Sequence, residues 1–519
     1  MARIFKDSKT FVDMRLRFSP QDVQANFQTL LSKHPSPSKE NIKDFVDENF
    51  TMKDQLVDHV PQDWVENPKI LSEIADKNYQ HFAKELNERW KLLSRKIVHD
   101  VKENQERTSL LYLPHPVVVP GGRFREVYYW DSFWIIRGLI HCEMYDTVKG
   151  MILNFVHLVE KYGKVPNGGR SYYLNRSQPP MLISMVKEYE NATGDKNFVK
   201  SILPCLLEEL NYWQKFHSVN VVSQSEKAFN MMRYNCEDVG PRPESYFEDY
   251  QLASKYCQTE DEKRDLYQEL KTGAESGWDY STRWYINNAS NVGDLEHTKT
   301  RLIVPVDLNS ICARNALVLA NYYDELTNDS KTAENLRQIG IQLTEAINEI
   351  LWHEEDGVWY DYDLVNGISR RYFSPSNLFP LWTESYHPDQ KEVQAKRAVE
   401  YLKSQSLDQY PGGVPTTFTK SGQQWDFPNC WPPLEHVIVE GLNKTGLNEA
   451  QELAYEIAEK RVRCGYLNFL NKGHMFEKYD ATSENSEGGG GEYEVQLGFG
   501  WTNGVVLDFL SKYGKRLES

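Results

Sequence analysis

Two acidic residues have neighbours that suit acid–base chemistry. Asp279 lies between Trp278 and Tyr280, and apolar neighbours raise the pKa of a carboxyl, as a general acid near neutral pH requires. Glu477 precedes Lys478, and an adjacent cation favours the ionised carboxylate that a general base must be. The pair predicts acid–base catalysis, but adjacency does not fix where Lys478 points, and an Asp between aromatics is also typical of a helix cap.

Charged residues gather near aromatic ones in three further segments. Hydrolysis of a glycoside needs two carboxyl groups, and binding a sugar needs planar donors, opposing acceptors and aromatic faces. The alternative is a set of structural salt bridges, which is about as probable for any one segment but weaker for all three together. The residues are Arg123, Glu126, Trp130 and Asp131; Arg170 and Arg176; and Arg242, Glu244, Glu248 and Asp249.

The composition excludes several classes of protein. The chain has 519 residues, with 59 Lys plus Arg against 75 Asp plus Glu, and its net charge of −16 argues against nucleic acid as a partner. No stretch approaches the roughly 18 apolar residues of a membrane-spanning helix. The sequence lacks phosphate-binding and zinc-protease motifs, its His residues are scattered, and its 7 Cys form no Cys-x-x-Cys pair. We therefore expect no metal and no cofactor.

Helical periodicity dominates the chain. One apolar stripe predicts a helix over residues 333–352. Alternating patterns are short, and the best, at residues 358–362 before the turn at Asn366-Gly367, predicts a hairpin. Similar helical stripes occupy residues 203–213, 312–326 and 450–458. We expect an all-α fold.

Long loops rich in Gly, Pro and aromatic residues separate the helices, and loops of this length are usually functional. Helical segments recur without a Pro/Ser-rich linker, which favours one toroid of paired helices over several domains. We expect residues 1–110 to form an N-terminal helical extension that packs on the toroid. Residues 111–519 would then form the catalytic toroid.

Two motifs resemble the signatures of a known family. Residues 120–131, Pro-Gly-Gly-Arg-Phe-Arg-Glu-Val-Tyr-Tyr-Trp-Asp, resemble the first signature of the trehalases, which are inverting glycosidases that split α,α-trehalose into two glucose molecules. Residues 424–433, Gln-Trp-Asp-Phe-Pro-Asn-Cys-Trp-Pro-Pro, resemble the second signature. The resemblance covers residues 110–510. Shorter matches lie at residues 166–173, 176–180, 242–244, 276–279, 477–480 and 488–493.

The resemblance implies an enzyme, an inverting α,α-trehalase with a single (α/α)6 toroid fold. It implies that Asp279 protonates the interglycosidic oxygen and that Glu477 takes a proton from the attacking water, so that one α- and one β-glucose are released. Inversion requires carboxyl groups about 6.5–9.5 Å apart. The resemblance also implies that a further set of residues lines the two glucose subsites: Arg123, Trp130, Asp131, Asn167, Arg176, Ser177, Gln178, Arg242, Glu244, Gly277 and Glu492.

Three details extend the resemblance. The Gly-rich segment Glu487–Thr502 is expected to fold over the substrate as a lid and bring Glu492 into contact with it. The sequence departs from the family at Phe133, where Tyr is usual, and at Cys430, where a small residue is common. An exposed, ionisable Cys430 would make the activity sensitive to thiol reagents.

Two alternative functions remain open. Another inverting toroid glycosidase, acting on an α-glucan or oligosaccharide, would use the same acid, base and aromatic surfaces. A sugar-binding protein without activity would lack one carboxylate, and both are present here. Arginine-dense loops favour a closed pocket for a small disaccharide over an open cleft. We expect a monomer whose partner is the small-molecule substrate trehalose.

The sequence gives conflicting indications about the compartment. Residues 1–18 lack the apolar run of a secretory signal, which by itself indicates a cytoplasmic protein. Five glycosylation sequons favour a secreted, extracellular protein whose signal peptide has been removed. We expect secretion, with the cytoplasm as the alternative. The sequons begin at Asn49, Asn191, Asn288, Asn328 and Asn443.

Overall fold

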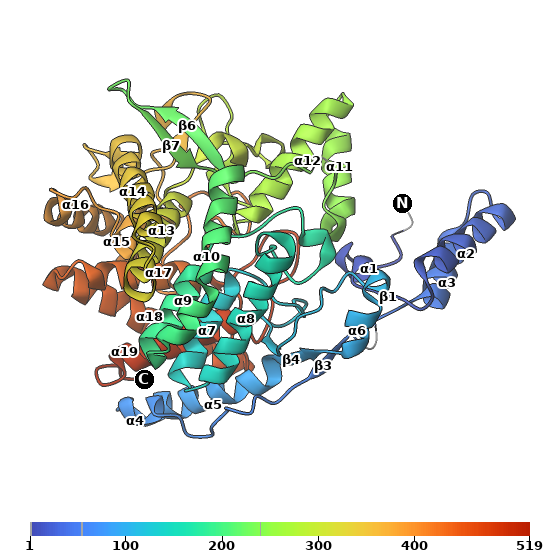
Figure 1. Cartoon of the computed structure of the whole chain (residues 1–519), viewed down its shortest axis with the longest axis horizontal. Helices are drawn as coiled ribbons and strands as arrows, with labels where there is room; N and C mark the ends of the chain where they lie inside the picture. Colours follow the sequence, from blue (N-terminus) through green and yellow to red (C-terminus); the bar gives the residue numbers. More distant parts are fainter. Residues whose placement is uncertain (1–2, 53–54, 239) are drawn as a thin grey trace.

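A closed ring of helices forms the centre of the molecule. The computed structural model describes residues 3–52, 55–238 and 240–519. Each helix of the inner ring contacts the next, and the last contacts the first, so the ring closes (Figure 1). The inner helices are α7 (Asp131–His141), α9 (Leu182–Thr193), α13 (Val306–Leu326), α15 (Phe379–Thr383), α17 (Pro432–Lys444) and α19 (Gly500–Tyr513).

An outer layer of helices surrounds this ring. Five outer helices follow their inner partners along the chain, and the sixth, α5, comes from the N-terminal part and packs on α19. The outer helices are α8 (Tyr145–Tyr162), α10 (Lys196–Phe216), α14 (Ser330–Ala346), α16 (Lys391–Ser404), α18 (Asn448–Lys472) and α5 (Lys77–Leu93). This arrangement confirms the predicted (α/α)6 toroid.

Helices outside the two layers belong mainly to the N-terminal part and to one long insertion. In the insertion, α11 and α12 pack on each other between α10 and α13. These additional helices are α1 (Lys9–Val12), α2 (Pro20–Lys33), α3 (Lys39–Asn49), α4 (Ile70–Glu73), α6 (His99–Glu103), α11 (Tyr246–Tyr256) and α12 (Glu260–Glu275).

All strands are short and belong to small antiparallel sheets. The three-stranded sheets have the orders β3-β4-β5 and β12-β11-β8, and β6 and β7 form the longest hairpin. The strands are β1 (Arg15–Leu16), β2 (Phe50–Thr51), β3 (Leu56–Asp58), β4 (Ser94–Ile97), β5 (Val117–Val118), β6 (Ser218–Val222), β7 (Ala228–Met232), β8 (Ile303–Val304), β9 (Trp352–His353), β10 (Val358–Trp359), β11 (Tyr362–Asp363), β12 (Ile368–Ser369), β13 (Asn429–Cys430) and β14 (Tyr479–Asp480).

The helical predictions are confirmed, whereas the alternating run at residues 358–362 is divided: Val358–Trp359 form β10, which pairs with β9, and β11 begins at Tyr362. The stripe at 333–352 falls on α14, which continues as a π-helical turn at Ile347–Leu351, and the other three stripes fall within α10, α13 and α18. The predicted hairpin is β11 paired antiparallel with β12 across the Asn366-Gly367 turn, with Tyr362 opposite Ser369.

Local signals in the sequence explain where several helices begin and end. At the start of α12, the Thr259 hydroxyl accepts from the Glu262 amide at 3.2 Å, and the Glu262 carboxylate accepts from the Thr259 amide at 3.1 Å. Helices α8 and α18 end at Gly163 and Gly473, which have φ of 71° and 73°. These caps satisfy backbone groups that a helix terminus leaves unpaired.

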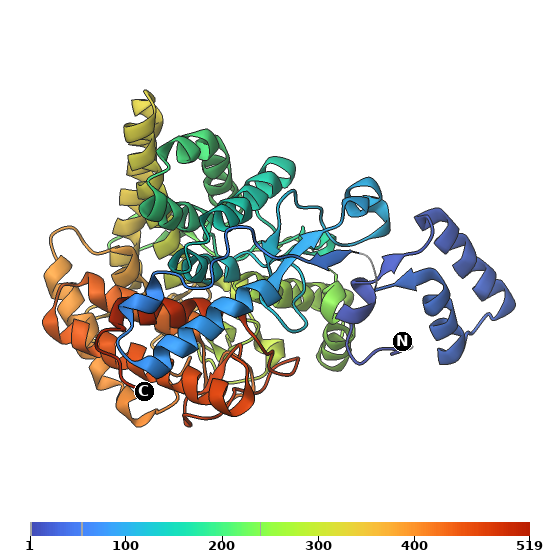
Figure 2. The same ribbon diagram turned by 90° about the horizontal axis from the view of Figure 1, so that it is seen from below.

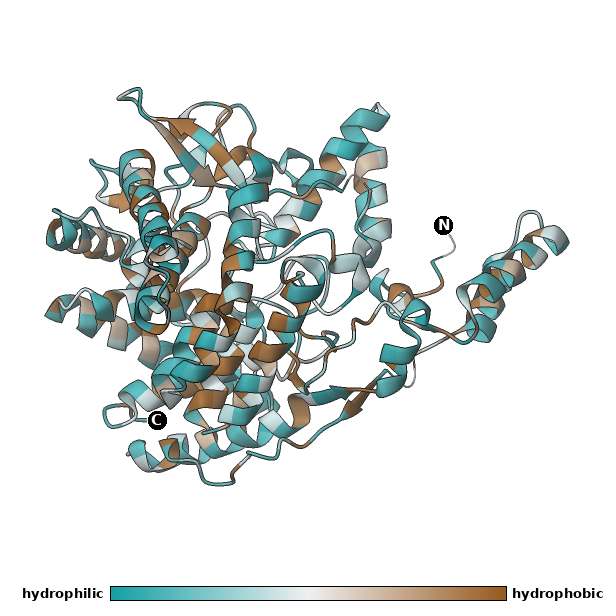
Figure 3. Ribbon diagram, in the orientation of Figure 1, coloured by the Kyte–Doolittle hydropathy of each residue, from teal (hydrophilic) through white to brown (hydrophobic). Residues whose placement is uncertain are grey.

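The apolar core fills the space between the helical layers. Figure 3 shows brown segments along the central helices and more teal on helices at the periphery, such as α2 and α3. One continuous cluster of buried residues joins Trp90 of α5, Leu319 of α13 and Val437 of α17. Burial of apolar surface between the layers therefore holds the inner helices in place.

The N-terminal part has two regions with different surroundings. Figures 1 and 2 show the hairpin of α2 and α3 projecting away from the ring, whereas α5 lies along it. Between them, α1 contacts the segment Pro243–Ser245. Among the residues that the structure describes, no helix is long and apolar enough to cross a membrane.

Candidate active site

A pocket lies at one end of the toroid, where the inner helices begin. Asp131 is the first residue of α7, and Trp431 directly precedes α17. Phe499 directly precedes α19, and Gln178 lies four residues before α9. Because the loops before these helices meet at one end, residues far apart in the sequence share one pocket.

The pocket contains both predicted catalytic residues and most of the predicted sugar contacts. Ser177 is the exception: it is fully buried behind the wall, where its hydroxyl donates to the Val165 carbonyl at 2.6 Å. Its amide donates to Glu275 at 3.0 Å, so Ser177 supports the wall instead of lining it. The predicted residues that do line the pocket are Arg123, Trp130, Asp131, Asn167, Arg176, Gln178, Arg242, Glu244, Gly277, Asp279, Glu477 and Glu492.

Asp279 has the environment that its sequence neighbours predict. Trp278 and Tyr280 are fully buried, and Trp278 stacks on Trp425 with ring centroids 5.2 Å apart. Burial raises the pKa of Asp279 to about 7, and the Glu492 carboxylate adds to the increase while Arg242 opposes it. A substantial fraction of Asp279 is therefore protonated near neutral pH.

Glu477 is buried as well, with only 2% of its surface exposed. Its Oε1 accepts a hydrogen bond from the Tyr493 hydroxyl at 2.9 Å. Among the residues described, none hydrogen-bonds the buried Oε2. The main chain is fixed on both sides, because the Glu477 amide donates to Gln496 O at 3.1 Å and the Trp501 indole donates to Glu477 O at 2.9 Å. One carboxylate oxygen is held and the other is free.

Lys478 influences Glu477 less than the sequence suggested. The Lys478 Nζ donates to Gln424 Oε1 at 2.7 Å, turned away from an ion pair with its neighbour. Burial raises the pKa of Glu477, and the charge of Lys478 and the hydroxyl of Tyr493 only partly offset it. The expectation that Lys478 alone would hold the carboxylate ionised is therefore too simple.

Asp131 is a third buried carboxyl in the pocket. Burial raises the pKa of Asp131 well above its usual range, and Glu477 and Asp279 add to the increase. Like charges so close together are not all ionised. The surroundings of Asp131 therefore favour its protonated form.

Two arginines that line the pocket are each held by neighbouring side chains. Arg176 donates to Asn167 Oδ1 at 2.6 Å and to Glu244 at 2.5 Å. Arg242 forms a bidentate pair with Asp249, at 3.0 and 2.6 Å, and also donates to Glu492 at 2.8 Å. These pairs hold planar donors at fixed angles, as recognition of neighbouring hydroxyls requires.

Glu126 and Arg170, which the sequence also singled out, lie beneath the pocket. The buried Lys9 Nζ lies 2.6 Å from both Glu126 and Asp13, and Arg170 lies 3.3 Å from Glu126. Tyr128 also donates to Glu126 at 2.6 Å. This buried ion network supports the first signature segment from behind.

Two sets of lining residues were missed from the sequence. The N-terminal residues Asp7, Ser8 and Lys9 form one side of the pocket, and no motif there indicated it. The second set is aromatic, and each of the two signatures already contained two of its members. This aromatic set is Phe124, Tyr128, Tyr173, Trp425, Trp431, Tyr493, Phe499 and Trp501.

The two departures from the family pattern lie in the core. Phe133 is fully buried and packs edge-on against Trp134 and Trp382. Cys430 is also fully buried, beside Tyr479, and burial raises the pKa of its thiol. The condition for sensitivity to thiol reagents, an exposed and ionisable thiol, is not met at Cys430. All seven cysteines are free thiols.

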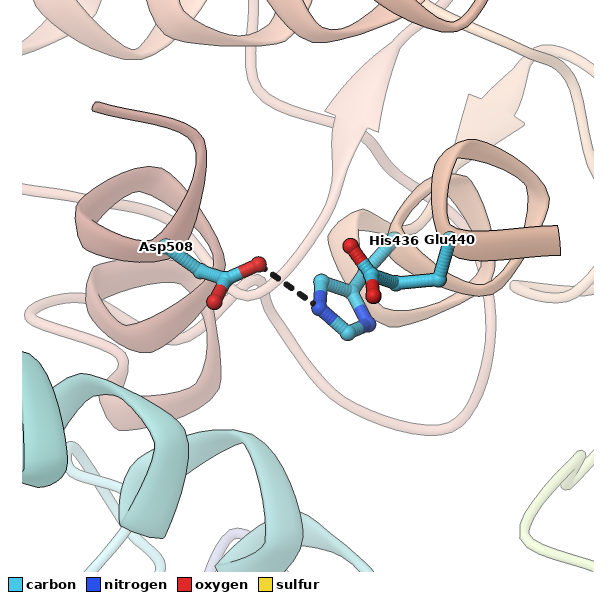
Figure 4. A group of neighbouring side chains, drawn as sticks. All are labelled: His436, Glu440 and Asp508. Atoms are coloured by element: carbon cyan, nitrogen blue, oxygen red, sulfur yellow. Dashed lines mark hydrogen bonds and ion pairs between the residues drawn. The ribbon is translucent and has the colours of Figure 1, made fainter. Parts of the chain in front are cut away.

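One group of side chains has the composition of a metal site: His436, Glu440 and Asp508 (Figure 4). His436 Nε2 lies 3.0 Å from Asp508, and its Nδ1 accepts from the Trp134 indole at 3.2 Å. Arg137 lies 2.5 Å from the same Asp508. The carboxylate is thus neutralised by arginine and both imidazole nitrogens are engaged, so the group fits a structural ion network better than a metal site.

The fold and the site together define a class of protein. A closed (α/α)6 toroid carries two buried carboxyls, paired arginines and aromatic faces in one pocket, which defines a toroid glycoside hydrolase. The Trehalase family model matches residues 3–514. The chain belongs to the trehalase family.

Comparisons with individual proteins agree with this assignment. The chain is 49% identical to a trehalase from Apis mellifera, over 100% of this chain and 83% of the relative, and 44% identical to a trehalase from Homo sapiens, over 100% and 88%. Among solved structures, the neutral trehalase from Saccharomyces cerevisiae superimposes with a TM-score of 0.61 at 24% identity, over 77% of this chain and 73% of that one. The solved structure supports the toroid fold.

Proposed function

We propose that the protein hydrolyses α,α-trehalose to two glucose molecules with inversion at one anomeric carbon. The observation that carries the proposal is the pocket itself, in which Asp279 and Glu477 share one cavity with the arginines. Membership of the trehalase family supports the choice of substrate.

Asp279 is proposed as the general acid. Since its pKa is about 7, the carboxyl retains a proton near neutrality and can transfer it to the interglycosidic oxygen as the bond breaks. Departure of neutral glucose avoids a buried alkoxide. Activity should therefore fall as the pH rises above about 7, because Asp279 then ionises.

Glu477 is proposed as the general base. Its free Oε2 can accept a proton from water while Tyr493 holds Oε1. The water attacks the anomeric carbon from the face opposite the leaving oxygen, which releases β-glucose from one half and α-glucose from the other. This step requires a carboxyl separation of about 6.5–9.5 Å.

The remaining pocket residues are proposed to bind the two glucose units. Arg123, Arg176 and Arg242 would donate to neighbouring hydroxyls, with Glu244 and Glu492 as acceptors. The aromatic faces would contact the C–H surfaces of the sugars. The arginine pairs enclose a small site, which suits a disaccharide better than a polymer.

Proton NMR of the anomeric region tests substrate and stereochemistry together. The expected result is that trehalose yields equal early amounts of α- and β-glucose, while maltose and a glucan oligomer remain intact. Release of α-glucose alone would indicate retention and remove Glu477 as the base. Cleavage of maltose or glucan without trehalose would indicate another toroid glycosidase, and no turnover would indicate a binding protein.

The role of Asp279 is tested by Asp279→Asn. Loss of the transferable proton should lower kcat by at least about 10²-fold, since general acid catalysis contributes about 10²–10⁴-fold. Calorimetry should show that the variant still binds trehalose. Asp261→Asn, at a side chain that is 95% exposed, is the control and should match the wild type. Near-normal turnover of Asp279→Asn would refute the assignment.

We also propose that the protein is a secreted monomer with no nucleic-acid partner. The net charge of −16 supports the absence of nucleic acid, and three exposed sequon asparagines support passage through a glycosylating compartment. Gel filtration with light scattering tests the oligomeric state. Those three asparagines are Asn191, Asn288 and Asn328.

A further inference from the structure

Residues 484–498, which overlap the Gly-rich segment Glu487–Thr502, carry two adjacent side chains that contact different parts of the pocket. The Glu492 carboxylate pairs with Arg242 at 2.8 Å and accepts from the Ser245 hydroxyl at 3.2 Å. Tyr493 points the other way and donates to Glu477 Oε1 at 2.9 Å. One short stretch of this segment therefore contacts the wall near the acid and the base itself.

The ring of Tyr493 is held from several sides. The Phe124 ring meets it edge-on, with centroids 5.4 Å apart. The Arg123 guanidinium lies 5.0 Å from the ring centroid, and the Lys478 ammonium lies 5.6 Å from it. These three contacts involve the ring and not the hydroxyl. They therefore fix the direction of the hydroxyl but do not occupy it as a hydrogen-bond donor.

The hydroxyl itself donates to Glu477 and also interacts with the Gln424 side chain. A carboxylate with two free oxygens can rotate about its last bond and offer either oxygen to water. In this pocket Oε1 is engaged by Tyr493, and only Oε2 is left without a partner among the described residues. The same segment also accepts from the Glu477 amide through Gln496 O, at 3.1 Å. Both the main chain and the carboxylate of Glu477 thus depend on residues 484–498.

We propose that Tyr493 is a positioning residue for the general base: its hydroxyl fixes Glu477 Oε1, so that Oε2 faces the attacking water only when residues 484–498 cover the pocket. The inference rests on the proposed function. It differs from a sugar contact, because the hydroxyl acts on the enzyme's own carboxylate. Opening of the segment would release Glu477 at the same time as it admits substrate.

The charges around Glu477 agree with this role. Burial raises the pKa of Glu477, and Lys478, the Tyr493 hydroxyl and Arg123 lower it. The charge of Glu477 in turn raises the pKa of Asp131 and of Asp279, which face the same carboxylate. Loss of the Tyr493 hydrogen bond removes one of the groups that keep the base ionised, so the base should become harder to ionise.

Tyr493→Phe tests the inference, because it keeps the ring contacts and removes only the hydroxyl. Loss of a hydrogen bond to a charged group shifts the pKa of that group by roughly 1–2 units. We expect the acidic limb of the kcat profile for trehalose to move up by about 1 unit and kcat to fall by roughly 10-fold at the pH optimum, with KM changed less than about 3-fold. Tyr256→Phe, on the partly exposed end of α11, is the control and should match the wild type.

A second measurement keeps the test decisive if Tyr493→Phe folds poorly. Site-specific replacement of Tyr493 by 3-fluorotyrosine keeps ring and hydroxyl but makes the phenol a stronger donor, and it should move the acidic limb down. An unchanged acidic limb in the folded Phe variant or in the fluorotyrosine protein would overturn the inference, as would a loss confined to KM. A failure of the proposed function can be told apart from a failure of this inference. In that case, the wild type itself would not hydrolyse trehalose with inversion in the NMR assay.

Discussion

Gly277 offers a quantitative test of how tightly the pocket is built. It lies two residues before Asp279 and has φ of +79°, a region that only glycine occupies readily. A Cβ at this position would lie 2.8 Å from two ring atoms of Trp130. Trp130 cannot easily move away, since Trp134 and Trp501 meet its ring edge-on at centroid distances of 5.4 and 6.1 Å.

The expected cost of Gly277→Ala has two parts. A left-handed backbone costs a residue with a Cβ about 1–2 kcal/mol. Overpacking against a fixed ring adds about 1–3 kcal/mol, so the free energy of unfolding should fall by roughly 2–5 kcal/mol in total. Gly473→Ala is the matched control, because Gly473 has φ of +73° and nothing within 4 Å of the added Cβ. Gly473→Ala should lose only the backbone contribution of about 1–2 kcal/mol.

Urea unfolding followed by tryptophan fluorescence measures both variants, and kcat/KM for trehalose is measured beside it. Gly277→Ala should lose more stability than Gly473→Ala and should also lose activity, because a displaced Trp130 changes the sugar-binding wall. Gly473→Ala should retain wild-type activity. Equal stability and equal activity of the two variants would refute the close approach of Gly277 to Trp130.

Three further predictions concern other parts of the molecule. Lys9→Met removes one of the two cations that pair with the buried Glu126 and leaves Arg170 to compensate both Glu126 and Asp13. It should lower the free energy of unfolding by about 3–5 kcal/mol, as measured by urea unfolding; a loss below about 1 kcal/mol would contradict the buried network. Burial raises the pKa of Glu209 to about 8 from the usual 4.5, so its favourable contribution is complete below pH 4.5 and is lost as the pH rises through 8. The stability of Glu209→Gln relative to the wild type should therefore increase by a few kcal/mol between pH 5 and 8, and a constant difference would exclude the shift. In protein from a secretory host, intact mass should show no glycan on Asn49, which is buried and donates to Phe45 O at 2.8 Å, whereas a glycan found there would contradict its burial. Glycans are expected at Asn191, Asn288 and Asn328.

The helical fold could be predicted because its signals are local. The stripe of α14 repeats every three to four residues, and the turn at Asn366-Gly367 joins strands that are adjacent in sequence. The completion of the outer layer by α5 could not be predicted in this way. Its contact with α19 joins residues more than 400 positions apart, and no short pattern encodes it.

The residues of the site also differ in whether local sequence signals predict them. Motif resemblance located Asp279 and Glu477, because both lie in dense sequence motifs. It did not reveal Asp7, whose place in the pocket depends on how α1 packs on the Pro243–Ser245 segment. It also included Ser177, since a motif does not distinguish a residue in the wall from one directly behind it.

The different roles proposed for Asp279 and Glu477 likewise depend on contacts and not on sequence neighbours. Burial raises the pKa of both Asp279 and Glu477, so burial alone cannot make one an acid and the other a base. The Glu492 carboxylate favours the protonated form of Asp279, whereas the Tyr493 hydroxyl favours the ionised form of Glu477. These two adjacent residues belong to one segment over the pocket. In this position over the pocket, the segment therefore opposes ionisation of the proposed acid and promotes ionisation of the proposed base.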